Sequence, residues 1–80
     1  MSIWEEVIQL ISHESIYPAS ITEDTNLYQD LHFDSLTFVN LLIGLEERYH
    51  ITIELPEMER CLIVGQLISI IEVKRKEKSV

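Results

Sequence analysis

Residues 30–49, D-L-H-F-D-S-L-T-F-V-N-L-L-I-G-L-E-E-R-Y, predict one long helix that begins after Asp34 and ends near Tyr49. Asp34 is a favourable N-cap because its carboxylate can accept a hydrogen bond from a free backbone N–H of the first turn. At about 100° per residue, the larger apolar side chains fall in one sector that we expect to face the core. These residues are Phe38, Leu41, Leu42, Leu45 and Tyr49.

The opposite side of this helix, called the outer face here, carries Leu36, Val39, Asn40, Ile43, Glu46 and Glu47, with Val39 and Glu46 at its margin. Apolar residues among carboxylates are typical of a docking surface for another protein. Isolated exposed apolar residues are also ordinary, and another segment could cover them. The pattern alone leaves both interpretations open.

One further helix is predicted before this one, and a short helical turn and a last helix are predicted after it. Ser2 and Glu5 have the spacing of a capping box, so the first helix should run from about residue 3 to about 13. Pro56 suits a first helical position, which predicts a brief helical turn up to Arg60 after an extended connector. The last helix should cover roughly residues 63–73, and the charged residues from 74 onward should fray. The fold class is therefore all-α.

Residues 14–34 form a long loop between the first two helices. A loop of this length in a small domain is generally functional or contains a short extra turn. Its apolar residues suggest that it is pinned across the helices, namely Ile16, Tyr17, Ile21, Leu27, Tyr28, Leu31 and Phe33.

Length and charge exclude several classes of protein. The 80 residues fit one domain, 1–80, with an ordered core of about 2–73 and a charged tail of 74–80. The net charge of −8 argues against nucleic acid and favours basic protein surfaces as partners. Nine acidic residues and no Lys or Arg lie in residues 1–47, so an electrostatic interaction surface is expected there.

The single cysteine, Cys61, cannot form an internal disulfide, and the Cys and His spacing indicates no metal site. We expect it to be a small core residue in a reducing, cytoplasmic setting. No apolar run reaches the roughly 18 residues of a membrane span, and Glu5 and Glu6 stand where a secretory signal would carry basic residues.

Ser35 is the residue best placed for phosphate chemistry, since it directly follows the predicted N-cap of a long helix. The alternative is that a serine at a helix start merely helps to cap it. A hydrolase built from Ser35, His32 and Asp34 is disfavoured, because neighbouring residues rarely form a relay and no oxyanion loop is indicated. No catalytic residue is therefore predicted.

Residues 30–49 resemble the acyl carrier protein family. The resemblance rests on Asp34-Ser35-Leu36 in context, with Leu27 and Asp30 upstream, then Ile51 and Ile53, and lastly V-G-Q-L at residues 64–67. It implies a four-helix bundle with a short third helix. It also implies that a separate phosphopantetheinyl transferase attaches a 4'-phosphopantetheine arm from coenzyme A to Ser35, with Asp34 and Leu36 beside it. The arm would hold acyl groups as thioesters, and the carrier itself would not be an enzyme.

We expect a monomer. The same resemblance implies that its outer face meets acyl-loading, condensing and acyl-transfer enzymes of fatty-acid, polyketide or similar specialised biosynthesis. Direct contact with these enzymes would come from Leu36, Val39, Asn40 and Ile43. The charges that steer basic partners would be those of Glu46 and Glu47. Thr37 and Asn40 stand at positions that are often acidic in the family, which favours a dedicated set of partner enzymes. Ile63 stands where the family commonly has a Thr that caps the last helix. An aminoacyl or peptidyl carrier and a non-carrying helical adaptor remain as alternatives.

Overall fold

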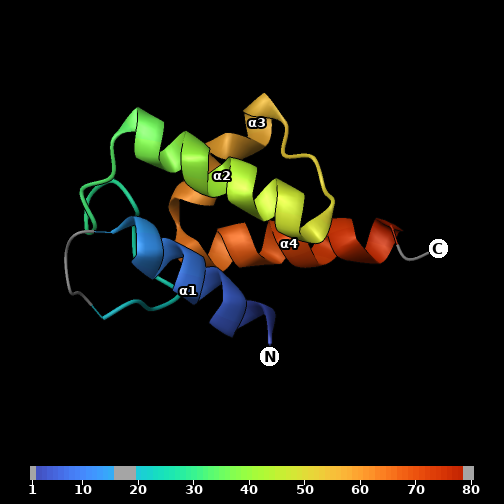
Figure 1. Ribbon diagram of the computed structural model, residues 1–80, viewed down its shortest axis with the longest axis horizontal. Coiled ribbons are helices and arrows are strands. Elements are labelled where there is room, and N and C mark those ends of the chain that lie inside the picture. The colour runs from blue at the N-terminus through green and yellow to red at the C-terminus, as the bar shows by residue number, and fades with distance from the viewer. Residues whose placement is uncertain (1, 16–19, 79–80) are drawn as a thin grey trace.

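The computed structural model describes residues 2–15 and 20–78, which fold into α1 (Ile3–Glu14), α2 (Ser35–Tyr49), α3 (Leu55–Met58) and α4 (Val64–Lys78). A 3₁₀ turn, η1 (Arg60–Leu62), links α3 to α4. Figure 1 shows α2 lying across α1 and α4, with short α3 beside it and the long loop at one end. The predicted all-α fold with a short third helix is confirmed.

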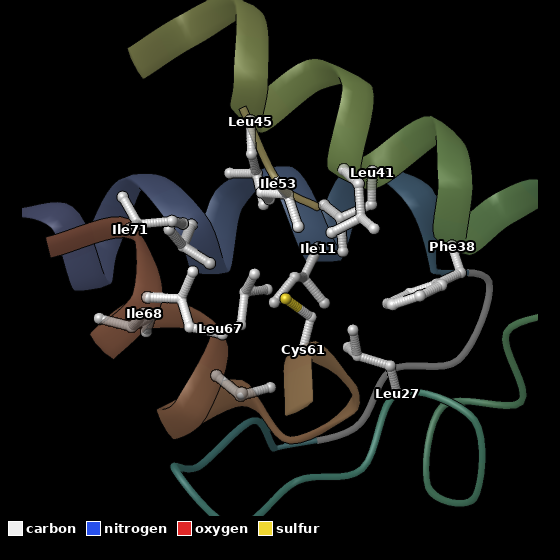
Figure 2. Close-up of a cluster of buried hydrophobic side chains, with 14 of the residues drawn as sticks. Ile11, Leu27, Phe38, Leu41, Leu45, Ile53, Cys61, Leu67, Ile68 and Ile71 are labelled. Atoms are coloured by element: carbon white, nitrogen blue, oxygen red, sulfur yellow. The ribbon is translucent and has the colours of Figure 1, made fainter. Parts of the chain in front are cut away.

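The core combines buried side chains of α1, α2 and α4 with buried residues of the loop and of the connector before α3. The predicted core face of α2 is confirmed by Phe38, Leu41, Leu42 and Leu45, while Tyr49 is only partly buried. Cys61 has no exposed surface and is drawn in the middle of the labelled cluster in Figure 2. Burial raises the pKa of its thiol to about 11, as expected of a core cysteine.

The first helix begins where the sequence predicted, with Ser2 Oγ accepting from the Glu5 backbone N–H at 3.2 Å. The Glu5 carboxylate accepts from the Ser2 hydroxyl at 3.4 Å instead of returning to the Ser2 backbone. Of the two hydrogen bonds of the predicted capping box, only the one from the Glu5 backbone N–H to the Ser2 side chain is therefore present. Pro56 is the second residue of α3 and not the first, so that the turn starts at Leu55.

The last helix is longer than predicted, since α4 continues to Lys78 instead of ending near residue 73. Two of the residues assigned to a charged tail have partners. Lys74 Nζ lies 2.9 Å from Glu57 Oε1, and the Arg75 guanidinium lies 5.3 Å from the centre of the Tyr49 ring. These contacts hold the basic side chains against the bundle, which favours a continuing helix.

The start of α4 is held by the loop and not by a side-chain cap. Val64 N–H donates to the Thr25 carbonyl at 3.0 Å, and Gly65 N–H donates to the Glu23 carbonyl at 2.9 Å. These two bonds satisfy backbone N–H groups of the first turn. A Thr side chain at position 63 could have helped to cap this turn, but the residue there is Ile63. The loop approaches so closely that a Cβ on Gly65 would lie 3.0 Å from the Glu23 carbonyl oxygen.

The described part of the loop is pinned as predicted, with Leu27, Leu31 and Phe33 buried. Ile16 and Tyr17 lie outside the described residues. Leu27 N–H donates to the Leu62 carbonyl at 2.8 Å, which ties the loop to η1. Within the loop, Asp30 Oδ2 accepts from Asn26 N–H at 2.8 Å. The loop therefore reaches α2 as an ordered segment.

A polar clasp joins α1 to the end of α2. Glu6 accepts from the Tyr49 hydroxyl at 2.6 Å and from the Arg48 guanidinium at 3.0 Å. These bonds, the one from Tyr49 first, hold the pKa of Glu6 below its usual range. Burial, with the Glu6 carboxylate beside it, raises the pKa of Tyr49 to about 12. The clasp fixes the far end of α2 while the loop fixes its start.

Candidate functional site

Ser35 is the first residue of α2 and its side chain is exposed. Asp34 is the N-cap, as predicted, and its Oδ1 accepts from the Thr37 backbone N–H at 2.8 Å. This hydrogen bond is the main reason why the pKa of Asp34 lies below its usual value. Asp34 is therefore anionic at neutral pH and holds the helix start on which Ser35 stands.

Packing against the core holds the turn of the chain that precedes Ser35. His32 has a left-handed backbone (φ 56°), and the next residue, Phe33, turns into the core. One turn into α2, the Phe38 ring meets the Tyr28 ring edge-to-face, with 5.5 Å between centroids. Tyr28 was predicted only as a loop anchor, yet this contact makes it a support for the first turn of α2.

The outer face of α2 is open in the structure. The side chains of Leu36, Val39 and Ile43 are 70%, 39% and 45% exposed, and Asn40 and Glu47 are also exposed. No other part of the described chain covers this stripe. The interpretation that another segment of the chain covers these apolar residues is therefore not supported by the described structure.

Glu46 differs from the other residues of the outer face. Its side chain is partly buried, and Oε2 accepts from the Ile53 backbone N–H at 2.9 Å. Glu46 therefore holds the connector before α3 against α2, a role that its marginal position on the helix did not reveal. Asp30, a further acidic residue near Ser35, is similarly bound within the loop.

Other types of site find no support in the described residues. Within residues 2–15 and 20–78, no group of three His, Cys, Asp or Glu side chains is arranged to hold a metal ion. None of the helices in this part of the chain is long and apolar enough to cross a membrane.

An exposed hydroxyl at the start of a 15-residue helix suits attachment of a phosphate ester. The first backbone N–H groups of a helix and its dipole favour a negative charge, and Asp34 already uses one such group. The exposed position leaves space for a long substituent. The residues present therefore fit a phosphodiester-linked arm.

Comparison with known proteins agrees with this geometry. The family described as "Phosphopantetheine attachment site" matches residues 1–71. The "Acyl carrier protein" of Campylobacter hominis is 32% identical over 79 residues, covering 98% of this chain and all of the relative. The chain belongs to the acyl carrier protein family. That of Wolinella succinogenes is 29% identical over 76 residues, or 94% of this chain, and that of Amoebophilus asiaticus 32% over 75 residues, or 92%.

As a member of the acyl carrier protein family, the chain is a carrier and not an enzyme, and it bears a covalently attached 4'-phosphopantetheine group. When bound, this group supplies the thiol on which cargo is held. In the structure, the start of α2 carries the exposed hydroxyl of Ser35, is capped by Asp34 and is supported by the ring contact of Phe38.

Proposed function

We propose that Ser35 carries the 4'-phosphopantetheine arm and that the domain presents acyl intermediates, held as thioesters, to enzymes of fatty-acid, polyketide or similar specialised biosynthesis. The observation that carries this proposal is the exposed hydroxyl of Ser35 at the first position of α2, directly after the Asp34 cap. Asp34 and Leu36 flank the attachment point, one fixing the helix start and the other offering an apolar contact to the transferase.

The partner enzymes would bind the outer face of α2. A phosphopantetheinyl transferase and acyl-loading, condensing and acyl-transfer enzymes must all reach Ser35, so their contacts should lie around it. Leu36, Val39 and Ile43 form an exposed apolar stripe, and Asn40 and Glu47 are polar neighbours of it. Glu46 would contribute charge mainly, because one carboxylate oxygen already binds Ile53.

The choice of pathway is proposed from the charge near Ser35. The first turn of α2 carries no acidic residue, with Thr37 at a position that resembles acidic positions in the family. Asn40, one turn further along, is also uncharged. This favours partners that recognise the apolar stripe more than a dense negative charge, as a dedicated biosynthetic pathway would.

We also propose that the protein acts as one monomeric domain in the cytoplasm. All three long helices and the loop contribute to one hydrophobic core. The one cysteine is buried and pairs with nothing, which suits a reducing compartment.

Intact mass spectrometry tests the attachment site. The purified protein is incubated with coenzyme A and a broad-specificity phosphopantetheinyl transferase, beside Ser35→Ala and the matched control Ser12→Ala, an exposed helical serine of α1. We expect one phosphopantetheine on the wild type and on Ser12→Ala and none on Ser35→Ala, with the helical circular dichroism unchanged. Loading of Ser35→Ala would refute the site, and an unmodified but folded wild type would favour the adaptor alternative.

The partner face is tested by the rate of the same loading reaction. Leu36→Ala and Ile43→Ala should lower kcat/KM by roughly ten-fold each, the effect of removing a central apolar contact worth about 1–2 kcal/mol. Val73→Ala is the matched control, since Val73 is exposed on α4. Equal rates for all variants would place the transferase contacts elsewhere.

A further inference from the structure

The side chain of Tyr28 lies beside the first turn of α2. Its ring meets the Phe38 ring edge-to-face, with 5.5 Å between the ring centroids. Phe38 comes three residues after Ser35, and residues at this spacing are neighbours on a helix, with Cβ atoms about 5–6 Å apart. The loop therefore places a tyrosine against the part of α2 that carries the Ser35 hydroxyl.

The backbone of Tyr28 is fixed by Asn26. Asn26 Oδ1 accepts from the backbone N–H groups of Tyr28 and Gln29, each at 2.9 Å. The Asn26 N–H in turn donates to Asp30 Oδ2 at 2.8 Å. A side chain that is already held in place loses little conformational entropy when it binds a further group. Tyr28 is therefore well prepared to bind a ligand at the start of α2.

The Tyr28 hydroxyl is not used by these contacts. Within residues 2–15 and 20–78, the ring packs on Phe38 and the backbone binds Asn26, but the hydroxyl binds no described group. In the same part of the chain, no side-chain oxygen or nitrogen is sealed from solvent without a partner. The hydroxyl of this half-buried side chain therefore opens to the surface. A phenylalanine could make the same ring contact, so packing alone does not explain the hydroxyl.

The charges near Ser35 restrict which groups could bind an anion there. No Lys or Arg occurs in residues 1–47, so neither the loop nor the start of α2 offers a lysine or arginine to a phosphate. Asp34, next to Ser35, is an anion. A hydroxyl is a neutral donor, and its hydrogen bond to an anionic oxygen is stronger than one between two neutral groups.

We propose that Tyr28 is a positioning residue for the arm, its hydroxyl donating a hydrogen bond to a phosphodiester oxygen of the 4'-phosphopantetheine group. This hydrogen bond depends on the proposed attachment of the arm to Ser35. The phosphate is the part of the arm nearest to Ser35, so it stays close to the first turn of α2, where Tyr28 lies.

The contact determines the direction in which the arm leaves the helix. Tyr28 packs on Phe38, which belongs to the buried side of α2, whereas Leu36 and Ile43 lie on the outer face. A phosphodiester bound to Tyr28 is drawn towards the loop and away from the exposed apolar stripe. The stripe then stays open to partner enzymes while the arm is attached.

The test is a thermodynamic cycle that combines Tyr28→Phe with attachment of the arm. Apo and holo forms of the wild type and of Tyr28→Phe are prepared with coenzyme A and a phosphopantetheinyl transferase, and intact mass verifies complete attachment. Thermal unfolding under reducing conditions gives the Tm of each form. Tyr49→Phe is the matched control, because its hydroxyl donates to Glu6 at the other end of α2, about 20 Å from Ser35.

Attachment of the arm should change Tm more favourably in the wild type than in Tyr28→Phe, by about 4–8 °C. This is the shift that one hydrogen bond of typical net strength gives in a domain of this size. In Tyr49→Phe, attachment should change Tm as it does in the wild type. The ³¹P NMR resonance of the phosphodiester should move in holo Tyr28→Phe and stay in place in holo Tyr49→Phe.

Equal changes in Tm on attachment in the wild type and Tyr28→Phe would overturn the inference, as would a ³¹P resonance that Tyr28→Phe leaves in place. Slower loading of Tyr28→Phe without these two effects would also overturn it, and would assign the hydroxyl to the transferase contact. A wild type that gains no phosphopantetheine, or a gain that survives Ser35→Ala, would overturn the inference together with the proposed function.

Discussion

The two glycines of the chain offer a matched pair of alanine substitutions with opposite expected effects. Gly44 lies inside α2, and a Cβ there would meet nothing within 4 Å. Gly65 lies in the first turn of α4, where a Cβ would lie 3.0 Å from the Glu23 carbonyl oxygen and 3.2 Å from the Glu23 Cβ. The same chemical change is thus made once in open space and once against the loop.

The magnitudes follow from these surroundings. Gly44→Ala should raise the free energy of unfolding by about 0.5–1 kcal/mol, because alanine loses less backbone entropy in a helix. Gly65→Ala should lower it by about 1–2 kcal/mol. The added methyl group must push the loop away and weaken the Gly65 N–H hydrogen bond to Glu23, and this cost of overpacking exceeds the gain in helix propensity.

Urea and thermal unfolding, followed by far-ultraviolet circular dichroism, would measure both effects. For a domain of this size, 1 kcal/mol corresponds to a change in Tm of about 4–8 °C, so the two variants should be well separated. A Gly65→Ala protein as stable as the wild type would refute the conclusion that the loop caps α4 at close range. Gly44→Ala shows whether the assay detects a gain from alanine alone.

Three further predictions concern charge and hydrogen bonding. Tyr49→Phe should lower Tm, since it removes the hydroxyl that donates to Glu6. Tyr28→Phe, which keeps its ring contact with Phe38, should change Tm less. Equal effects of the two substitutions in thermal scans would argue against the clasp. Added NaCl or MgCl₂ should raise Tm, because the chain carries a net charge of −8, and a flat titration would contradict this. The pKa values of Glu6, Asp34 and Glu57 are lowered in the folded protein, so their stabilisation is fully present above the ordinary carboxyl range and is lost as pH falls through it towards the lowered values. Urea unfolding at a series of pH values should show stability falling below about pH 4, and constant stability there would show that these carboxylates contribute little.

Much of α2 was predictable because its signals are local. The Asp34 cap and the helical spacing of Phe38, Leu41, Leu42 and Leu45 set its start, its length and its buried side. The exposure of Leu36 and Ile43 follows from the same spacing. Ser35 was identified as a candidate because a helix start has local sequence signals, and the resemblance to acyl carrier proteins suggested the role that we propose for it.

The sequence was less informative where a contact with a residue far away in the chain determines the local structure. Lys74 reads as part of a charged tail, but its bond to Glu57 places it against α3 and lets α4 continue. Glu46 reads as a surface carboxylate, yet it binds the Ile53 backbone. Ile63 stands where a capping Thr is common in the family, and carbonyl groups from the loop satisfy the first N–H groups of α4 instead. None of these partners can be recognised from spacing along the chain.

Local sequence signals specify the helical class, the limits and buried face of α2, and the serine at its start. Capping and helical periodicity act within one or two turns, so that a single chain segment contains all the information. Tertiary structure alone decided how the loop caps α4, how Glu6 clasps α2 and how Glu57 holds α3. Those contacts join residues that are far apart in sequence, and they exist only once the helices have packed around the common core.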